Sequence, residues 1–383
     1  MPGTGKSQLG DGNGLFGVEE ENRVKHKMIC SSFIVLICGF VLAACGAQGM
    51  NHTEADDFAE QHLNTGSDGV EENDAPDHAE LEEIRMASWS QPIAEQSNLY
   101  LADEKGWFQE ACLEFTYIPG AGGGDAIKNI LAGNADIAFA NVEAVLLAAE
   151  QGADLKIVYN IYPENVFNIV SLKENGIRSA QDLQGKDVGV YSLSSGTYDN
   201  LKVLLYEAGM NEEDVNMIET GVLNFAPLMN GQVVATAATD TGLYDAKRAG
   251  LGEVHVIEMK DILNTPSDVF VVTEEAFTKK KELLIRFLQV YRDSVQYTIE
   301  HPDEAAEIAV SRALDGQDQA RNEAIIKIRN RTSVNEQMKK KGLGWLDVDL
   351  FKTVEEAYVN TGLLKEKVGI ENMVTNEWVG ELQ

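Results

Sequence analysis

The fold of this chain is decided between residues 125 and 161, where the sequence reads DAIKNILAGNADIAFANVEAVLLAAEQGADLKIVYNI. Apolar residues recur at helical spacing over 125–132 and stop at a glycine, the residue type that most often ends a helix. A short apolar run over 137–140 then predicts a buried strand. The same order repeats as a predicted helix over 142–151 and a predicted strand over 156–161. Short strands that alternate with helices in this way are typical of β-α-β units.

Elements of the same two kinds extend in both directions from this stretch. Before it, the apolar pattern predicts strands over 84–89 and 113–118, separated by a helix over 94–105. After it, a second α/β series has predicted strands at 187–191, 215–219, 234–238, 254–258 and 268–273 and predicted helices at 198–208, 225–229 and 243–248. The remainder is almost wholly helical and begins with one long amphipathic helix over 274–300.

This order of elements predicts an α/β protein of two lobes, each with a mixed, mostly parallel sheet flanked by helices, and a helical C-terminal tail. We expect the second lobe over 177–265, inserted into a first lobe that is formed by 84–176 and 266–383. Two hinge strands, near 169–173 and 265–269, would then cross between the lobes. Ligands bind at the carboxyl ends of strands in such folds, so the cleft between the lobes is the expected binding site.

Residues 1–44 combine an N-terminal extension with the pattern of an export signal. An apolar run starts near Met28, follows Arg23, Lys25 and Lys27, and ends in Leu-Ala-Ala-Cys45-Gly. This ending resembles a bacterial lipobox, which implies that Cys45 is acylated and that the lipid anchors the mature chain outside the cytoplasmic membrane. An ordinary secretory signal and an uncleaved anchor helix are the alternatives.

Residues 45–83 are predicted to form an acidic, disordered tether. The segment from Gly46 to Glu83 contains twelve Asp or Glu residues and no Lys or Arg, and such a composition cannot bury enough apolar surface to fold. The whole chain has a formal net charge of −31, which argues against a nucleic-acid partner. Beyond Cys45 the sequence has one cysteine, Cys112, so the mature chain has no intramolecular disulfide and depends on a large core. We expect a monomer with no cofactor and no metal site.

Three segments resemble, in order and spacing, motifs of the type 2 periplasmic binding proteins. They read NLYLADEKGWF at 98–108, LAGNADIA at 131–138 and SAQDLQGKDVGV at 179–190. The likeness covers about residues 84–310 and is greatest to the branch that takes up nitrate, alkanesulfonates, taurine and thiamine-pyrimidine precursors. This resemblance implies a protein that closes two lobes around a small organic solute and delivers it to the permease and ATPase of an ABC importer.

Two other functions are compatible with the same scaffold. The branch includes thiamine-pyrimidine synthases, enzymes that consume their own histidine and use a Cys-rich segment. This chain has no Cys cluster and no His in the turns expected to face the cleft, so we expect no catalytic residues. A ligand sensor that signals to a membrane kinase is the second alternative.

Three turns of the first lobe are expected to face the cleft. The candidate residues in them are Trp89, Ser90, Gln91, Gly122, Gly123 and Asn141. Trp89 ends a strand and can stack on a planar ligand or pack in the core. The glycines precede a helix, where the backbone can approach a ligand closely. Asn141 can hydrogen-bond a ligand or cap its own helix.

The second lobe and the return hinge supply the other candidates. These are Ser194, Ser195, Gly196, Thr197, Asp240, Ser267 and Asp268. The first four open a helix, so hydroxyls and backbone N–H groups converge at a site suited to an anion. Asp240 can hold an amino group of a ligand, whereas Ser267 and Asp268 contact the ligand or only fix the hinge.

These turns contain no Lys or Arg, which limits the predicted ligand. A sulfonate or nitrate would be held by helix ends and hydroxyls without a formal counter-charge. The acidic candidates favour a ligand with an amino group, and an aminopyrimidine or a zwitterion such as taurine satisfies both conditions. The sequence leaves two ligand classes open, an alkanesulfonate or taurine-like solute and an aminopyrimidine thiamine precursor.

Overall fold

A computed structural model describes residues 80–221 and 225–382 of the chain. The predicted export signal, Cys45 and nearly all of the predicted tether lie outside the described residues. No helix of the described part is both long and apolar enough to span a membrane.

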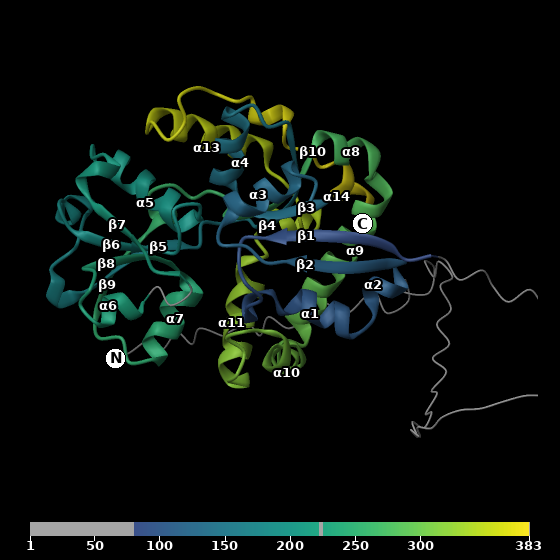
Figure 1. The fold of residues 1–383 in the computed structure, drawn as a ribbon, viewed down its shortest axis with the longest axis horizontal. Coiled ribbons are helices and arrows are strands. Elements are labelled where there is room, and N and C mark those ends of the chain that lie inside the picture. The colour runs from purple at the N-terminus through teal and green to yellow at the C-terminus, as the bar shows by residue number, and fades with distance from the viewer. Residues whose placement is uncertain (1–79, 222–224, 383) are drawn as a thin grey trace, which may run out of the picture. The chain divides into compact units, whose positions relative to one another are not determined.

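The first sheet has the strand order β2-β1-β3-β10-β4 (Figure 1). Its strands are β1 Glu82–Ser88, β2 Leu113–Ile118, β3 Ile137–Asn141, β4 Leu155–Tyr162 and β10 Asp268–Thr273. Strand β1 pairs in parallel with β2 and β3, whereas β10 runs antiparallel to β3 and β4. All strands of this sheet except β10 therefore point the same way, as the sequence predicted.

The second sheet repeats this arrangement with the order β7-β6-β8-β5-β9. Its strands are β5 Phe167–Leu172, β6 Asp187–Val190, β7 Asn216–Glu219, β8 Ala235–Thr239 and β9 Val254–Glu258. Strand β5 is antiparallel to both of its neighbours, and the other pairs are parallel. Because β5 lies wholly in this sheet, the sheet begins at Phe167, before the boundary expected at residue 177, and the strand expected as a hinge near 169–173 does not cross.

Two connections join the sheets, residues 163–166 between β4 and β5 and the segment that leads from β9 into β10. Side chains tie these connections together. The amide of Asn165 donates to the backbone oxygen of Leu263 at 3.1 Å and to the hydroxyl of Thr265 at 3.3 Å. The hydroxyl of Ser267 donates to the backbone oxygen of Glu164 at 2.7 Å. The crossing point is therefore a small hydrogen-bonded cluster and not a pair of strands.

Helices cover both sheets (Figure 1). Their bounds are α1 Ser97–Glu104, α2 Trp107–Glu110, α3 Gly123–Leu131, α4 Val142–Glu150, α5 Gly196–Glu207, α6 Ala226–Met229, α7 Asp240–Arg248, α8 Glu274–Lys279, α9 Lys281–Glu300, α10 Pro302–Arg312, α11 Gln319–Thr332, α12 Met338–Lys341, α13 Val348–Asn360 and α14 Glu377–Glu381, and the 3₁₀ turn η1 Ala94–Gln96 precedes α1. The long helix expected over 274–300 is two helices. It breaks at Lys280, whose backbone leaves the helical region and whose ammonium contacts Asp136 at 2.5 Å.

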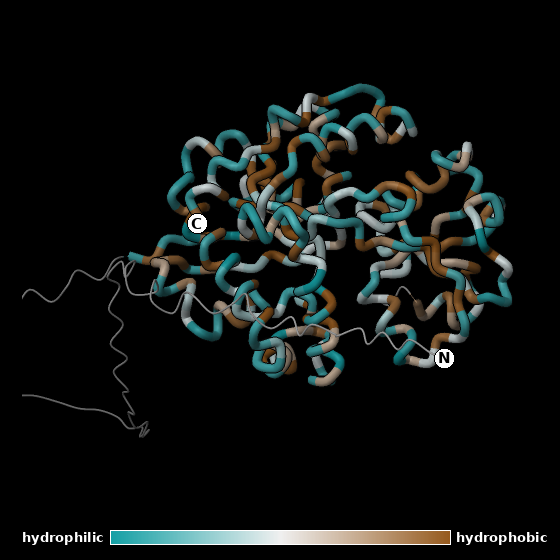
Figure 2. Tube along the Cα trace, turned by 180° about the vertical axis from the view of Figure 1, so that it is seen from behind, coloured by the Kyte–Doolittle hydropathy of each residue, from teal (hydrophilic) through white to brown (hydrophobic). Residues whose placement is uncertain are grey.

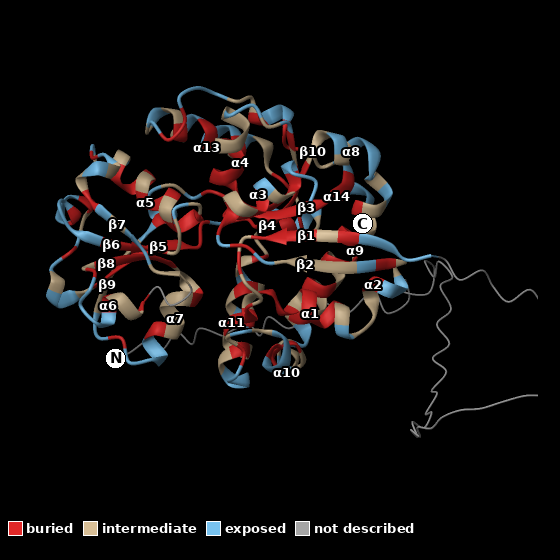
Figure 3. Ribbon diagram, viewed as in Figure 1, coloured by how far each residue is buried: buried red, intermediate tan, exposed pale blue. Residues whose placement is uncertain are grey.

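Strands β3, β4, β5, β8 and β10 are buried on both faces, which explains their continuous apolar sequence, whereas the edge strands β2, β7 and β9 are largely half-buried or exposed. Ala138 and Ala140 of β3 pack in the cluster that contains α3 and α4, and Ile137 and Phe139 pack in the cluster that contains α1 and α9. Figure 3 shows the first sheet buried toward its centre and less buried along β2, and Figure 2 shows apolar residues gathered toward the interior of the described part. The turns at the strand ends carry the polar groups of the site.

Candidate functional site

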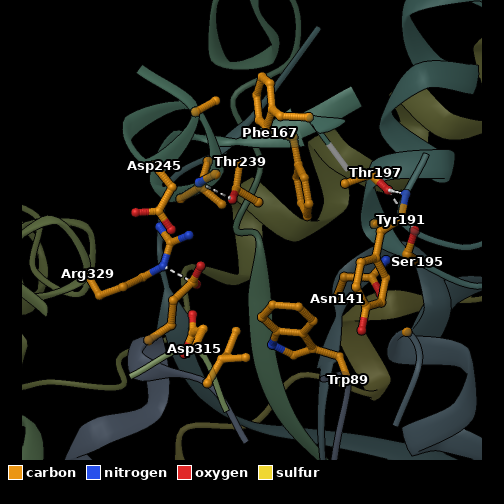
Figure 4. Close-up of a pocket in the computed structure, with 18 of the residues that line it drawn as sticks. Trp89, Asn141, Phe167, Tyr191, Ser195, Thr197, Thr239, Asp245, Asp315 and Arg329 are labelled. Carbon is orange, nitrogen blue, oxygen red and sulfur yellow. Dashed lines mark hydrogen bonds and ion pairs between the residues drawn. The ribbon is translucent and has the colours of Figure 1, made fainter. Parts of the chain in front are cut away.

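A cavity of about 340 Å³ lies between residues of the first sheet, the second sheet and the C-terminal helices (Figure 4). The residues that line it are Trp89, Ile93, Glu95, Gly122, Gly123, Asn141, Val166, Phe167, Tyr191, Ser195, Gly196, Thr197, Phe225, Ala226, Met229, Thr239, Gly242, Asp245, Ala246, Ala249, Asp268, Asp315, Arg321 and Arg329. Its volume is within the range of about 300–1,000 Å³ that is usual for sites of small ligands.

Aromatic rings form much of the wall. Trp89, directly after β1, meets Tyr191 edge to face, with ring centroids 6.3 Å apart and an interplanar angle of 79°. Figure 4 shows Trp89, Tyr191 and Phe167 around the same space. Phe167 lies so close to the start of α5 that a Cβ on Gly196 would stand 2.4 Å from its ring, so only glycine fits there. These rings give the cavity an apolar aromatic surface.

Ser90 and Gln91 support the turn after β1 and do not line the cavity. Ser90 is 2% exposed and accepts a hydrogen bond from the Gln96 amide at 3.0 Å. Its backbone oxygen accepts from the Tyr117 hydroxyl at 3.0 Å. The Gln91 amide donates to the backbone oxygen of Gly120 at 3.2 Å. Both side chains are engaged beneath the turn that carries Trp89.

The glycine loop, residues 120–124, contacts the second lobe. The backbone N–H of Gly124 donates to the backbone oxygen of Ser194 at 3.1 Å. A Cβ on Gly122 would stand 2.3 Å from that same oxygen, so the close approach requires glycine. Gly122 and Gly123 line the cavity, whereas Ser194 packs on the loop and does not. Contacts between the lobes thus use part of the backbone that the sequence assigned to a ligand.

The amino end of α5 is placed as expected, but its hydroxyls already have partners. Ser195 Oγ donates to the backbone oxygen of Ser192 at 2.6 Å and lies 2.7 Å from Thr197 Oγ1. Thr197 Oγ1 accepts from the backbone N–H of Tyr191 at 2.9 Å. Ser195, Gly196 and Thr197 line the cavity, and the hydroxyls of Ser195 and Thr197 hold the turn in shape. An anion bound here would have to compete with these bonds.

A buried polar junction joins α4 to α5 beside the cavity. Asn200 donates to Glu143 at 3.0 Å, and the Tyr358 hydroxyl donates to the same carboxyl oxygen at 2.6 Å. The Asn141 amide donates to Glu143 at 3.0 Å and to Asp199 at 3.2 Å. Burial raises the pKa of both carboxyl groups, that of Asp199 to about 7, and the neighbouring Glu143 charge raises the pKa of Asp199 further. Among the described residues no ion pair is formed with either carboxyl group, although the Lys202 charge opposes the rise in the pKa of Asp199.

Arg329 of α11 brings a cation to the cavity that the turns lack. It is 4% exposed, donates to Glu95 at 2.7 Å and to Thr241 at 2.9 Å, and pairs with Asp240 at 2.6 Å. Asp240 is therefore the ion-pair partner of Arg329 and does not line the cavity. Arg321 lies about two turns before Arg329 on α11 and pairs with carboxylates of α7 and of the loop before α11.

Of the two candidate residues at the hinge, only Asp268 lines the cavity. The Ser267 hydroxyl accepts from the backbone N–H of Val166 at 2.9 Å as part of the crossing cluster, and it does not line the cavity. Asp268, the next residue, does line it. Burial raises the pKa of Asp268 to about 8, and the charges of Glu143 and Glu95 act in the same direction, against Arg329. No group of His, Cys, Asp or Glu in the described residues is arranged to hold a metal ion.

Sequence reasoning missed several lining residues. Phe167, Tyr191 and Phe225 belong to apolar runs that equally predict core positions, so their sequence pattern carries no separate signal. Arg329 lies in a helix far along the chain, and only the return of α11 to the second lobe brings it to the cavity. Tyr191 directly precedes the serine-rich turn, and this position was the one available signal for it.

Comparisons with known proteins agree with this architecture. The chain is 25% identical over 304 residues to the riboflavin-binding protein RibY of Chloroflexus aurantiacus, which covers 78% of this chain and 86% of that protein. It is 23% identical over 243 residues to the formylaminopyrimidine-binding protein of Halalkalibacterium halodurans, covering 62% of this chain and 73% of that protein. The alkanesulfonate-binding protein SsuA from Xanthomonas axonopodis pv. citri, bound to MOPS, has the same fold with a TM-score of 0.60, 16% identity and coverage of 78% and 99%.

The family described as NMT1/THI5 like matches residues 94–305, more than half of the chain. The resemblance to periplasmic binding proteins that the three sequence motifs indicated is thereby confirmed, together with the fold class. The matched range spans both sheets and ends in α10. The chain belongs to the NMT1/THI5-like family and has the fold of the periplasmic binding proteins.

Proposed function

We propose that this protein is the solute-binding subunit of an ABC importer and that its solute is a planar nitrogen heterocycle. The observation that carries the proposal is the ring-lined cavity, in which Trp89, Tyr191, Phe167 and Phe225 offer flat apolar surfaces. Stacking on aromatic side chains suits heteroaromatic solutes such as a flavin or an aminopyrimidine. The names of two relatives support the same class, since one is called riboflavin-binding and the other formylaminopyrimidine-binding.

The charges around the cavity argue against a sulfonate or nitrate. Four carboxyl groups line it, those of Glu95, Asp245, Asp268 and Asp315. The two arginines that line it, Arg321 and Arg329, are both paired with acids. An anion would enter a site with an excess of negative charge and without a free counter-ion. We therefore favour the aminopyrimidine side of the two ligand classes that the sequence left open and add flavins to it.

Export, lipid attachment at Cys45 and docking on a permease complete the proposal. They are supported by the apolar run and lipobox-like ending in the sequence and by the family to which the chain belongs. An exported enzyme and a membrane-kinase sensor gain no support from the described side chains. We expect fatty-acid labelling of the wild type in cells and no labelling of Cys45→Ala, whereas equal labelling of both would contradict the anchor.

Calorimetry with the purified full-length protein tests the ligand class. We expect binding of riboflavin or of 4-amino-5-hydroxymethyl-2-methylpyrimidine and none of taurine, ethanesulfonate or nitrate. Trp89→Leu should weaken that binding roughly tenfold, because it removes a stacking surface from the cavity. Trp107→Leu is the matched control, since Trp107 packs on Tyr297 at 5.3 Å and does not line the cavity. Binding of the sulfonates alone would overturn the proposal.

A further inference from the structure

Asp268 is a buried carboxyl group that faces the cavity without a partner. It begins strand β10, lines the cavity and is 5% exposed. Within the described part of the chain, its side chain makes no hydrogen bond or ion pair. A buried polar group in this state costs free energy unless a partner arrives. The partner of Asp268 is therefore to be sought in the ligand.

The arginines nearby do not fill this role. Arg329 gives its hydrogen bonds to acids and a hydroxyl on other elements, and Arg321 is bound to two further carboxylates. Strand register places Asp268 opposite Asn141 of β3 and Tyr162 of β4, so its position is fixed from both sides. A fixed, unpaired carboxyl group in a cavity lined by aromatic residues can form hydrogen bonds with the edge of a ring that stacks there.

We propose that Asp268 binds the edge of a nitrogen heterocycle on which an N–H donor and an acceptor lie side by side. This inference rests on the proposed function and narrows its substrate class. A carboxylic acid forms two parallel hydrogen bonds with such an edge, because its hydroxyl donates to the acceptor while its carbonyl oxygen accepts from the N–H. The edge occurs in an aminopyrimidine, as an amino group beside a ring nitrogen, and in a flavin, as a lactam. A sulfonate lacks it.

The surroundings keep this carboxyl group in the neutral form that the pairing requires. Burial raises its pKa to about 8, so most of the group is protonated at neutral pH. The titratable and charged groups that face it are Glu95 of η1, Glu143 of α4, Tyr162 of β4, Tyr291 of α9 and Arg329 of α11. The two glutamates favour the neutral form, and the arginine opposes it.

This pairing predicts an unusual order among substitutions. An asparagine side chain also carries a donor and an acceptor side by side, so it reproduces the neutral acid. Asp268→Asn should therefore bind within about threefold of wild type, whereas Asp268→Leu, which loses both hydrogen bonds, should lose roughly ten- to hundredfold. An ion pair with a cationic ligand would give the opposite result for Asp268→Asn.

The experiment is calorimetry on the full-length wild type and both variants between pH 6.5 and 9, with melting temperatures as the folding control. The probes are riboflavin, 3-methylriboflavin, whose methyl group removes the lactam donor, and 4-amino-5-hydroxymethyl-2-methylpyrimidine. We expect wild-type affinity to fall as pH passes about 8, where Asp268 ionises, and the affinity of Asp268→Asn to stay level. If riboflavin binds, its 3-methyl derivative should bind about as weakly as riboflavin binds to Asp268→Leu.

The outcomes separate this inference from the function on which it rests. Tight binding of a heterocycle that is equal in wild type and folded Asp268→Leu would overturn the role of Asp268 and leave the solute class standing. If Asp268→Asn loses as much affinity as Asp268→Leu, the carboxyl group binds as an anion in an ion pair. This result would also overturn the proposed role of Asp268. Failure of wild type to bind any of the heterocycles would overturn both.

Discussion

Gly196 leaves room for the ring of Phe167 because it has no side chain. A Cβ at this position would stand 2.4 Å from the ring, so Gly196→Ala must displace this ring, which lines the cavity. We expect a loss of heterocycle affinity of roughly tenfold or more with a small change in melting temperature. Gly380→Ala in α14 is the control, since a Cβ there meets no atom within 4 Å. A variant of Gly196 that binds as wild type would show that the ring does not border the ligand.

At the scale of residues, the sequence predicted which turns lie beside the cavity better than it predicted which side chains point into it. Strand ends were located from periodicity, and Trp89 and Asp268 line the cavity. The residues next to them, Ser90 and Ser267, do not line the cavity, because their side chains form internal hydrogen bonds. Side-chain direction after a strand depends on turn geometry, which a one-dimensional pattern does not contain. Rings such as Phe167 were missed because burial in a core and burial around a ligand require the same residue type.

At the scale of elements, helix α11 holds the second lobe through a buried ion pair. Arg329 is 4% exposed and bonded to Glu95 and Asp240, so Arg329→Leu would leave two carboxylates without a partner. We expect a loss of about 3–5 kcal/mol in the free energy of unfolding, measured by denaturant titration. Arg331→Leu, at an exposed position of the same helix, should change stability by less than about 0.5 kcal/mol. Similar losses of stability in Arg329→Leu and Arg331→Leu would show that the loss comes from leucine in α11 and would contradict the role of the ion pair.

The contact between α4 and α5 predicts an unusual pH dependence of stability. Burial raises the pKa of Asp199 to about 7, above its ordinary value, so the folded state binds a proton that the unfolded state has released. The free energy of unfolding should therefore fall as pH rises from about 4 to about 7, by about 1.4 kcal/mol for each unit of pKa difference. The raised pKa values of Glu143 and Asp268 add to this slope, so Asp199→Asn should reduce it, whereas Asp261→Asn, at an exposed position, should leave it unchanged. Equal slopes in wild type and Asp199→Asn would contradict the assignment.

At the scale of the whole described unit, two connections and one hydrogen-bonded cluster join the lobes. The sequence predicted both α/β series but placed one crossing too late, because β5 has the apolar pattern of any strand and its sheet partners lie far along the chain. The crossing itself is held by Asn165 and Ser267. The bond from Gly124 to Ser194 joins the glycine loop to the turn before α5, so we expect it to break if the lobes rotate about this cluster.

Small-angle scattering on residues 81–383 tests this movement. We expect a larger radius of gyration without solute than with a saturating heterocycle, because the open state separates the glycine loop from the turn before α5. Asn165→Ala should broaden the range of lobe arrangements in the ligand-free protein, seen as a broader distribution of interatomic distances, because it removes hydrogen bonds from the crossing cluster. Curves that superimpose with and without a bound solute would show that the lobes do not rotate.

Trp89 has a consequence for spectroscopy. The chain has four tryptophans, and Trp89 is the one of them that lines the cavity, while Trp378 is fully buried in the core. A flavin that stacks on its indole would quench the emission of that ring far more than the emission of the others. The protein thus carries an intrinsic optical reporter of occupancy, and the fraction of emission lost on binding, compared between wild type and Trp89→Leu, reads the filling of the cavity without any label.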